Sequence, residues 1–156
     1  FAYYVIWRCF FIKFNYVDML NQFLTNVFML KNNFYNLYFN IKGKGSSSLI
    51  ISLEDNIKSI NEIYIKLAEL IKKIGGYPIM NLSEIKNVST IKEIVSKDYD
   101  VDEASDIMLS NLTLINNMNK QVGEYAFKNN DLDSINFVLN FNNYLSNNIR
   151  LLKMNK

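Results

Sequence analysis

Histidine is absent from this sequence, and cysteine occurs only once, at Cys9. Histidine is the commonest metal ligand and the commonest general base, so its absence excludes zinc sites of the Cys/His type and histidine-dependent catalytic triads. A single cysteine excludes an internal disulfide framework and fits a reducing compartment. The sequence therefore predicts a cytoplasmic protein without disulfides, and its composition requires no metal or other cofactor.

Proline and glycine are also scarce, with one Pro and five Gly in 156 residues, so long uninterrupted helices are allowed. The formal net charge is only +2, which gives no strong electrostatic case for binding nucleic acid. No stretch reaches the about 18–20 unbroken apolar residues of a membrane span. The nearest stretch, residues 1–12, is interrupted by Arg8, so membrane insertion is not expected.

Hydrophobic residues make up 49% of the chain and aromatic residues 14%, enough for one domain with a sizeable core. Residues 1–17 differ from the remainder, because they are crowded with aromatic side chains and contain no Asp or Glu. Two interpretations of this N-terminal extension stay open: an apolar turn or helix at a subunit interface, or residues that precede a natural start at Met19. The folded domain is assigned to residues 18–156.

Apolar residues recur at helical spacing in four long segments. The spacing predicts helices over residues 17–41, 47–74, 101–127 and 132–153. Gly43 and Gly75 follow the first two segments, where a left-handed residue commonly ends a helix. Between residues 78 and 100 the pattern weakens, and a short helical turn is expected over residues 82–85. The prediction is an all-α fold, a four-helix bundle with one long crossover between its second and third long helices.

Three groups of residues at fixed spacing resemble one known family. They are residues 37–43 (LYFNIKG), 75–78 (GGYP) and 81–85 (NLSEI). These groups are similar to the end of helix A, the end of helix B and the short helix between B and C in the Dps-like branch of the ferritin superfamily, the DNA-binding proteins from starved cells. The resemblance covers residues 18–152 with little or no gapping. It implies a ferritin-like four-helix bundle that assembles into a hollow homo-dodecamer.

The resemblance also implies iron sequestration, stress protection of DNA and a ferroxidase centre shared between neighbouring subunits. The family's histidine ligands fall on Tyr38 and Ile50. Its carboxylate ligands fall on Glu54, Ile65 and Glu69. The candidate metal ligands are therefore Glu54, Glu69 and Tyr38. Since isoleucine cannot bind iron, the centre is degenerate, and we expect ferroxidase activity to be weak or lost.

An alternative role for the two glutamates stays open. Glu54 and Glu69 are also typical of ordinary helix-surface acids at a subunit interface, either solvated or paired with Lys66 or Lys73. In that case iron is not bound at these positions.

Two further groups follow from the resemblance. The acidic residues of the family's three-fold pore fall near the start of the last helix, where Asp133 keeps the charge and Asp131 lies close. The candidate DNA contacts are Arg150, Lys153 and Lys156, which a shell would repeat many times. Cations at a helix C-terminus also complement the helix dipole, so this simpler role for the three residues remains open.

Three alternatives to an iron-oxidising cage are compatible with the sequence. One is a purely structural or interaction cage without ferroxidase activity. Another is a mixed assembly in which a related subunit supplies the missing ligands. The last is a helical bundle whose aromatic N-terminus attaches to a membrane or a partner. In the cage interpretations, assembly is better preserved than the chemistry.

Overall fold

The computed structural model describes residues 2–154, and it describes side chains from Tyr16 onward. Five helices follow one another along the chain: α1 (Ala2–Asn40), α2 (Ser46–Lys73), α3 (Leu82–Val88), α4 (Val101–Lys128) and α5 (Leu132–Met154). Residues 2–154 contain no strand, only an isolated parallel bridge between Ile41 and Tyr99. The predicted all-α bundle with one long crossover and a short intervening helix is confirmed.

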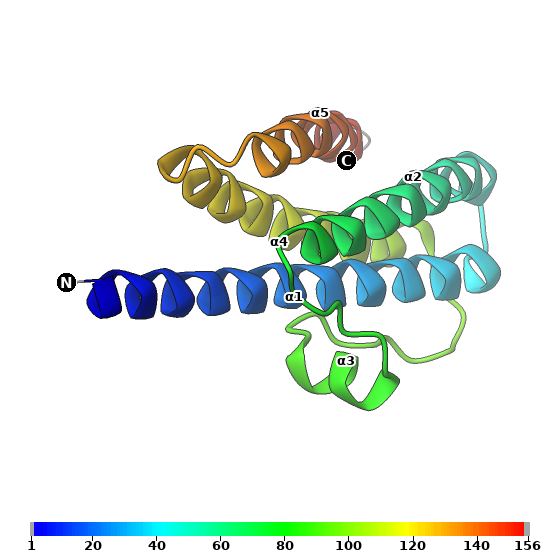
Figure 1. Ribbon diagram of the computed structural model, residues 1–156. Helices are drawn as coiled ribbons and strands as arrows, with labels where there is room; N and C mark the ends of the chain where they lie inside the picture. Colours follow the sequence, from blue (N-terminus) through cyan, green and yellow to red (C-terminus); the bar gives the residue numbers. More distant parts are fainter. Residues whose placement is uncertain (1, 155–156) are drawn as a thin grey trace.

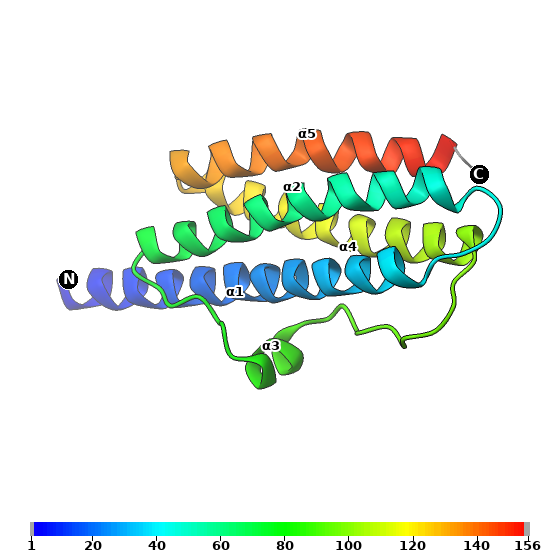
Figure 2. The same ribbon diagram turned by 90° about the vertical axis from the view of Figure 1, so that its right-hand side faces the viewer.

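Two helical hairpins, α1–α2 and α4–α5, pack against each other mainly through α1 and α4 (Figure 1). Figure 2 shows the four long helices running side by side, with α3 outside the bundle next to α1. The helices α2 and α5 contact each other less than the two hairpin pairs do. A groove therefore remains between α2 and α5, and it matters for the candidate site.

The first helix begins much earlier than the apolar spacing predicts. It is continuous over 39 residues from Ala2 to Asn40, with no break at residue 17. The predicted extension is therefore helical from residue 2, while the domain boundary at residue 17 stays a prediction. No helix within residues 2–154 has the length and apolar character that crossing a membrane would require.

The inner faces of the four long helices share one apolar cluster. Its fully buried side chains include Leu20, Phe23, Phe34 and Leu37 from α1, Leu53, Ile60 and Leu67 from α2, Met108, Leu112 and Ile115 from α4, and Leu145 from α5. Burial of each such side chain contributes about 1.5–3 kcal/mol. Spacing of three or four residues places them on one stripe per helix, so the sequence pattern indicates which face of each helix turns toward the core.

The end of α2 is set by two glycines, as the sequence predicts. Gly75 has a left-handed φ of 82°, and its N–H donates to the Lys72 carbonyl at 3.0 Å. The N–H of Gly76 donates to the Ile71 carbonyl at 2.9 Å, which completes a Schellman cap. Gly76 also lies so close to α1 that an added Cβ would be 2.8 Å from a methyl group of Val17.

Asparagines on α1 fasten the loops around α3 to the bundle. Asn21 donates to the Tyr77 carbonyl and accepts from the Ile79 N–H, both at 2.9 Å. Asn33 makes the same pair of bonds with residues 92–94 of the crossover, at 2.9 and 3.1 Å. Buried backbone groups need such partners outside regular structure. These amides therefore hold α3 and the crossover on α1.

Candidate metal centre and its surroundings

Two of the predicted metal ligands, Tyr38 on α1 and Glu54 on α2, both lie within electrostatic range of Lys58. The Lys58 ammonium donates to a carboxylate oxygen of Glu54 at 3.1 Å. The hydrogen bond and the charge of Glu54 raise the pKa of Lys58, with smaller contributions from Asp55 and Tyr38. The position that would hold a cation between Tyr38 and Glu54 is thus next to a cation of the protein itself.

Glu69, the third predicted ligand, does not join this group within one chain. Glu54 and Glu69 lie on the same helix, α2. A rise of 1.5 Å per residue therefore separates them by about 22 Å. A single site containing both carboxylates requires a second copy of the chain.

Isoleucines occupy two more of the positions at which the family has ligands. Ile50 is partly buried against the core, and Ile65 is 49% exposed on α2. Neither side chain can coordinate a metal. Among the side chains that the structure describes, no three Cys, Asp or Glu residues gather into a group that could hold a metal ion. The residues of one chain therefore do not fit an iron centre.

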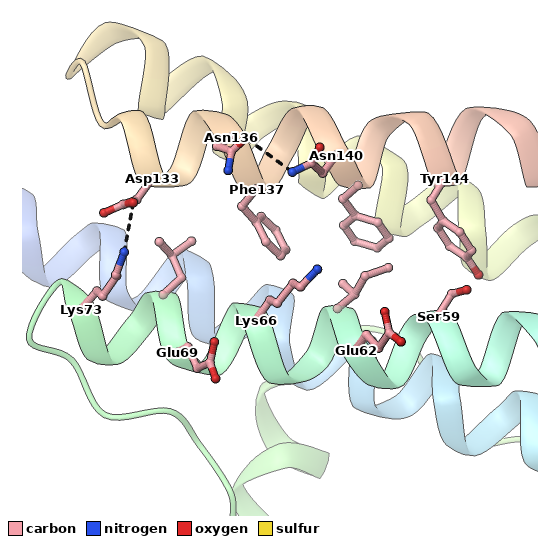
Figure 3. Close-up of a pocket in the computed structure, with 13 residues that line it drawn as sticks. Ser59, Glu62, Lys66, Glu69, Lys73, Asp133, Asn136, Phe137, Asn140 and Tyr144 are labelled. Carbon is pink, nitrogen blue, oxygen red and sulfur yellow. Dashed lines mark hydrogen bonds and ion pairs between the residues drawn. The ribbon is translucent and has the colours of Figure 1, made fainter.

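Glu69 lines the groove between α2 and α5, a pocket of about 420 Å³ (Figure 3). Charged side chains along its walls are Glu62, Lys66, Glu69 and Lys73 from α2 and Asp133 from α5. The aromatic rings of Phe137, Phe141 and Tyr144 also line it. Because three acids and two lysines line the groove, it has little excess negative charge with which to concentrate cations.

The phenol of Tyr144, which lines this groove, already has a hydrogen-bond partner within the chain. Its hydroxyl donates to the side-chain oxygen of Asn56, and the Asn56 amide donates to the Ser52 carbonyl at 2.7 Å. Burial raises the pKa of Tyr144 well above its ordinary value. Tyr144 therefore stays a neutral hydrogen-bond donor and does not supply a phenolate ligand.

Both predicted pore acids have partners within the chain. Asp133 forms an ion pair with Lys73 at 3.0 Å at the mouth of the groove (Figure 3). Asp131 caps α5, because one of its oxygens accepts the Ser134 N–H at 3.2 Å and the other accepts the Ser134 hydroxyl. The Tyr16 hydroxyl donates to the Ser134 hydroxyl oxygen at 2.6 Å. The pore assignment stays a prediction, and these partners weaken the field that Asp133 and Asp131 could supply.

The candidate DNA contacts lie in the last turns of α5. Arg150 and Lys153 are exposed there, and Arg150 donates to the Asn147 side-chain oxygen at 3.2 Å. Lys156 lies outside the described residues. The placement is compatible with phosphate contacts and with complementing the dipole of α5, so both roles remain open.

Comparison with known proteins agrees with the helix order and the connections. A family model described as the ferritin-like domain matches residues 17–153. The chain belongs to the ferritin-like family. No curated protein matches its sequence. The predicted ferritin-like bundle is therefore confirmed over most of the chain.

Solved structures of Dps proteins share the fold of this ferritin-like chain. Dps from Vibrio cholerae O1, described as one of the ferritin-like diiron-carboxylate proteins, has a TM-score of 0.87 at 17% identity over 92% of this chain and 89% of that chain. Dps from Staphylococcus aureus has a TM-score of 0.83 at 23% identity over 89% and 93%. Antigen TpF1 from Treponema pallidum has a TM-score of 0.89 at 17% identity over 92% of each chain. At these identities the likeness is one of fold, and the Dps-like resemblance is confirmed at that level.

Lys58 is the residue of this ferritin-like chain that sequence interpretation missed. The alternative role of the two glutamates pairs them with Lys66 or Lys73, whereas Glu54 pairs with Lys58 and Lys73 pairs with Asp133. The available signal was the spacing, since a glutamate four residues before a lysine is the favourable order on a helix. That spacing is common on helix surfaces and does not by itself indicate a site.

Proposed function

We propose that this chain is a cage-forming subunit of the Dps type with a degenerate metal centre, whose ferroxidase activity is weak or lost. The shell is a homo-dodecamer, and iron is its cargo where it binds metal at all. The ferritin-like fold, complete with α3 between the second and third long helices, supports the proposal. The absence of histidine and the isoleucines at two ligand positions support the loss of chemistry.

The observation that supports assembly is an exposed apolar surface between α2 and the loop that precedes α3. A groove of about 560 Å³ lies along α2, lined mainly by apolar side chains that include Tyr64, Ile65, Ala68, Pro78 and Met80. Further exposed apolar side chains on α1 and α2 are Tyr35, Phe39 and Ile51. Exposed apolar surface of this extent is typical of contacts between subunits. A second copy of the chain is the partner that a homo-oligomeric shell supplies.

Shared sites between copies follow from the spacing of the two glutamates. Because about 22 Å separates Glu54 from Glu69 on one helix, only a neighbouring copy can bring the carboxylate of Glu69 to Glu54. Two carboxylates and the phenol of Tyr38 remain per shared site, a poor set for holding ferrous iron during oxidation. Iron entering such a shell is therefore bound weakly and oxidised slowly.

Protection of DNA in the cytoplasm belongs to the same proposal. Arg150 and Lys153 would be repeated on every subunit, and repetition turns weak phosphate contacts into measurable avidity. Retardation of plasmid DNA that disappears with rising salt, and in the variant with both residues changed to Ala, is the expected result. Retention of binding by that variant would place the contact elsewhere.

A purely structural or interaction cage is the second candidate function. The ion pair between Lys58 and Glu54 favours it, because the lysine competes with any metal for that carboxylate. A mixed shell, in which a related subunit contributes intact ligands, would restore chemistry that this chain lacks. Ferrous oxidation by a co-expressed mixture, but not by this chain alone, separates the mixed shell from the structural cage.

The assembly is tested by native mass spectrometry of the unmodified chain and two matched variants. Ile65→Lys places a charge at the apolar groove, and Leu139→Lys places one on α5 at a side chain of similar exposure, 49% against 52%. We expect a dodecamer for the unmodified chain and loss of contact between copies in Ile65→Lys. Leu139→Lys should still form dimers. A monomeric unmodified chain would refute the cage.

A further inference from the structure

The outer face of α2 carries one continuous stripe of six side chains. At steps of three or four residues, the stripe contains Ile50, Glu54, Lys58, Asn61, Ile65 and Glu69. Ile50 is partly buried and the other five are exposed. Ile65 and Glu69 border a groove with Pro78 and Met80, and Glu69 also lines the groove toward α5. The exposed side chains of the stripe can still form a surface that contacts a second copy.

The stripe is symmetric about its midpoint between Lys58 and Asn61. Glu54 and Ile65 lie at equal distances from this point along the helix, and Ile50 and Glu69 do so as well. A two-fold axis through the midpoint sets two copies of α2 antiparallel and is the simplest self-complementary contact. Each end of the contact then combines two isoleucines with Glu54 of one copy and Glu69 of the second copy.

Lys58 is positioned to reach both acids of such a pair. Its ammonium lies 3.1 Å from Glu54, one turn back along α2. Helical side chains lean toward the N-terminus of their helix, so Glu69 of the second copy leans toward the level of its own Ile65, which faces Glu54. The two carboxylates therefore converge where the Lys58 ammonium lies.

We propose that Lys58 takes the place of the metal ion, its ammonium bridging Glu54 of its own chain and Glu69 of a second copy at a two-fold contact. This inference rests on the proposed function, since it needs copies of the chain to assemble. An ammonium supplies one positive charge and three donors, enough to satisfy two carboxylates and the nearby phenol of Tyr38. The ion pairs of Lys58 with the two glutamates contribute little while they are solvated. They become essential for the contact between copies once the isoleucines on both sides exclude water, because an unpaired buried charge is strongly unfavourable.

Removal of the lysine should convert the contact into a cation site. Lys58→Ala leaves Glu54 and Glu69 facing each other without a counter-ion, which weakens assembly at least about tenfold without added metal. Addition of Co²⁺ should restore assembly in Lys58→Ala and produce visible cobalt absorption. The unmodified chain, whose site already contains an ammonium, should show neither effect.

Three variants complete the experiment, which is read by native mass spectrometry and cobalt absorption. Lys58→Arg should assemble like the unmodified chain, because it keeps the positive charge. Lys120→Ala changes an exposed lysine of α4, away from the stripe, and should have no effect. Glu69→Gln combined with Lys58→Ala should abolish the cobalt rescue.

The outcomes separate this inference from the proposed function. If the unmodified chain forms a shell and Lys58→Ala forms it equally well and ignores Co²⁺, the bridging role of Lys58 is wrong and the cage stands. If the unmodified chain is monomeric, both are wrong. Circular dichroism of Lys58→Ala should match the unmodified chain, since the Lys58 side chain is 67% exposed.

Discussion

The side-chain oxygen of Asn26 accepts a hydrogen bond from the backbone N–H of Ile91 at 2.7 Å. The same oxygen also accepts from the Thr90 N–H at 3.0 Å and from the Ser89 hydroxyl at 2.9 Å. Asn26 is fully buried on α1. One amide thus satisfies the backbone at the point where the chain leaves α3, and this contact sets the path of the crossover.

Replacing Asn26 tests that role. Asn26→Ala leaves several buried donors without a partner, so we expect the free energy of unfolding to fall by about 2–4 kcal/mol. Chemical denaturation followed by circular dichroism measures the change. Asn32→Ala, an exposed asparagine on the same helix, is the matched control and should change stability by less than about 0.5 kcal/mol. Equal stability of both variants would show that the crossover is held by other contacts.

The close approach of Gly76 to Val17 makes a second prediction. Gly76→Ala places a Cβ 2.8 Å from a Val17 methyl group, which should destabilise the fold by about 1–3 kcal/mol. Val17→Ala removes that methyl group, so the double variant should recover most of the loss caused by the alanine at position 76. A double-mutant cycle from denaturation curves measures the coupling. Additive effects would mean that the backbone, rather than Val17, absorbs the added methyl.

Tyr16 makes the stability depend on alkaline pH. Burial is the main reason that its pKa rises from 10.0 to about 12, and the nearby charge of Asp131 adds to the rise. The folded chain keeps a proton that the unfolded chain releases, so this contribution is complete below pH 10 and is lost as the pH rises from about 10 to about 12. Tyr16→Phe should therefore show a shallower loss of stability over that range.

The unmodified chain and the Tyr16→Phe variant both contain Tyr144, whose pKa is also raised by burial. The contribution of Tyr144 to the pH dependence therefore cancels when the two proteins are compared. Tyr16→Phe should also cost about 1 kcal/mol at neutral pH through the lost hydrogen bond with Ser134. Urea denaturation at several pH values between 8 and 12 gives both quantities. Parallel curves for the two proteins would exclude Tyr16 as the titrating group.

Restoring the family's ligands should restore chemistry. Tyr38→His, Ile50→His and Ile65→Asp, combined with Lys58→Ala, place two imidazoles and a further carboxylate beside Glu54 and Glu69. We expect this variant to oxidise ferrous iron at least about tenfold faster than the unmodified chain, because imidazole and carboxylate together bind iron far better than isoleucine. Stopped-flow absorption of ferric products measures the rate. An assembled variant without activity would place the site elsewhere.

The helices were predictable from sequence, and the loops were not. Spacing of apolar residues locates α2, α4 and α5 within a few residues, and the Gly75–Gly76 pair marks the end of α2. The start of α1 at Ala2 is not specified by the sequence, which leaves a helix over residues 1–17 as one of two interpretations, because an apolar run cannot be assigned by its pattern alone. The role of Asn26 cannot be predicted from the sequence, because a polar residue on a helix usually faces water and the hydrogen-bond partners of Asn26 are about 65 residues away.

The candidate site was predictable in part. The resemblance indicates Tyr38, Glu54 and Glu69, and the structure places the first two within electrostatic range of Lys58 and the third far along α2. Lys58 was missed because a Glu–Lys pair four residues apart is ordinary on a helix surface. The bridging role proposed for Lys58 depends on contact with a second copy of the chain, and no pattern within one chain specifies that contact.

Ferrous-iron loading of size-fractionated protein, with mass and bound metal measured on the same fractions, tests the central claim most directly. The claim is that assembly is kept and iron chemistry is weak or lost. We expect a dodecamer that oxidises ferrous iron little faster than buffer and retains little metal. A dodecamer that rapidly oxidises and stores many irons, or a monomer under the same conditions, would contradict it.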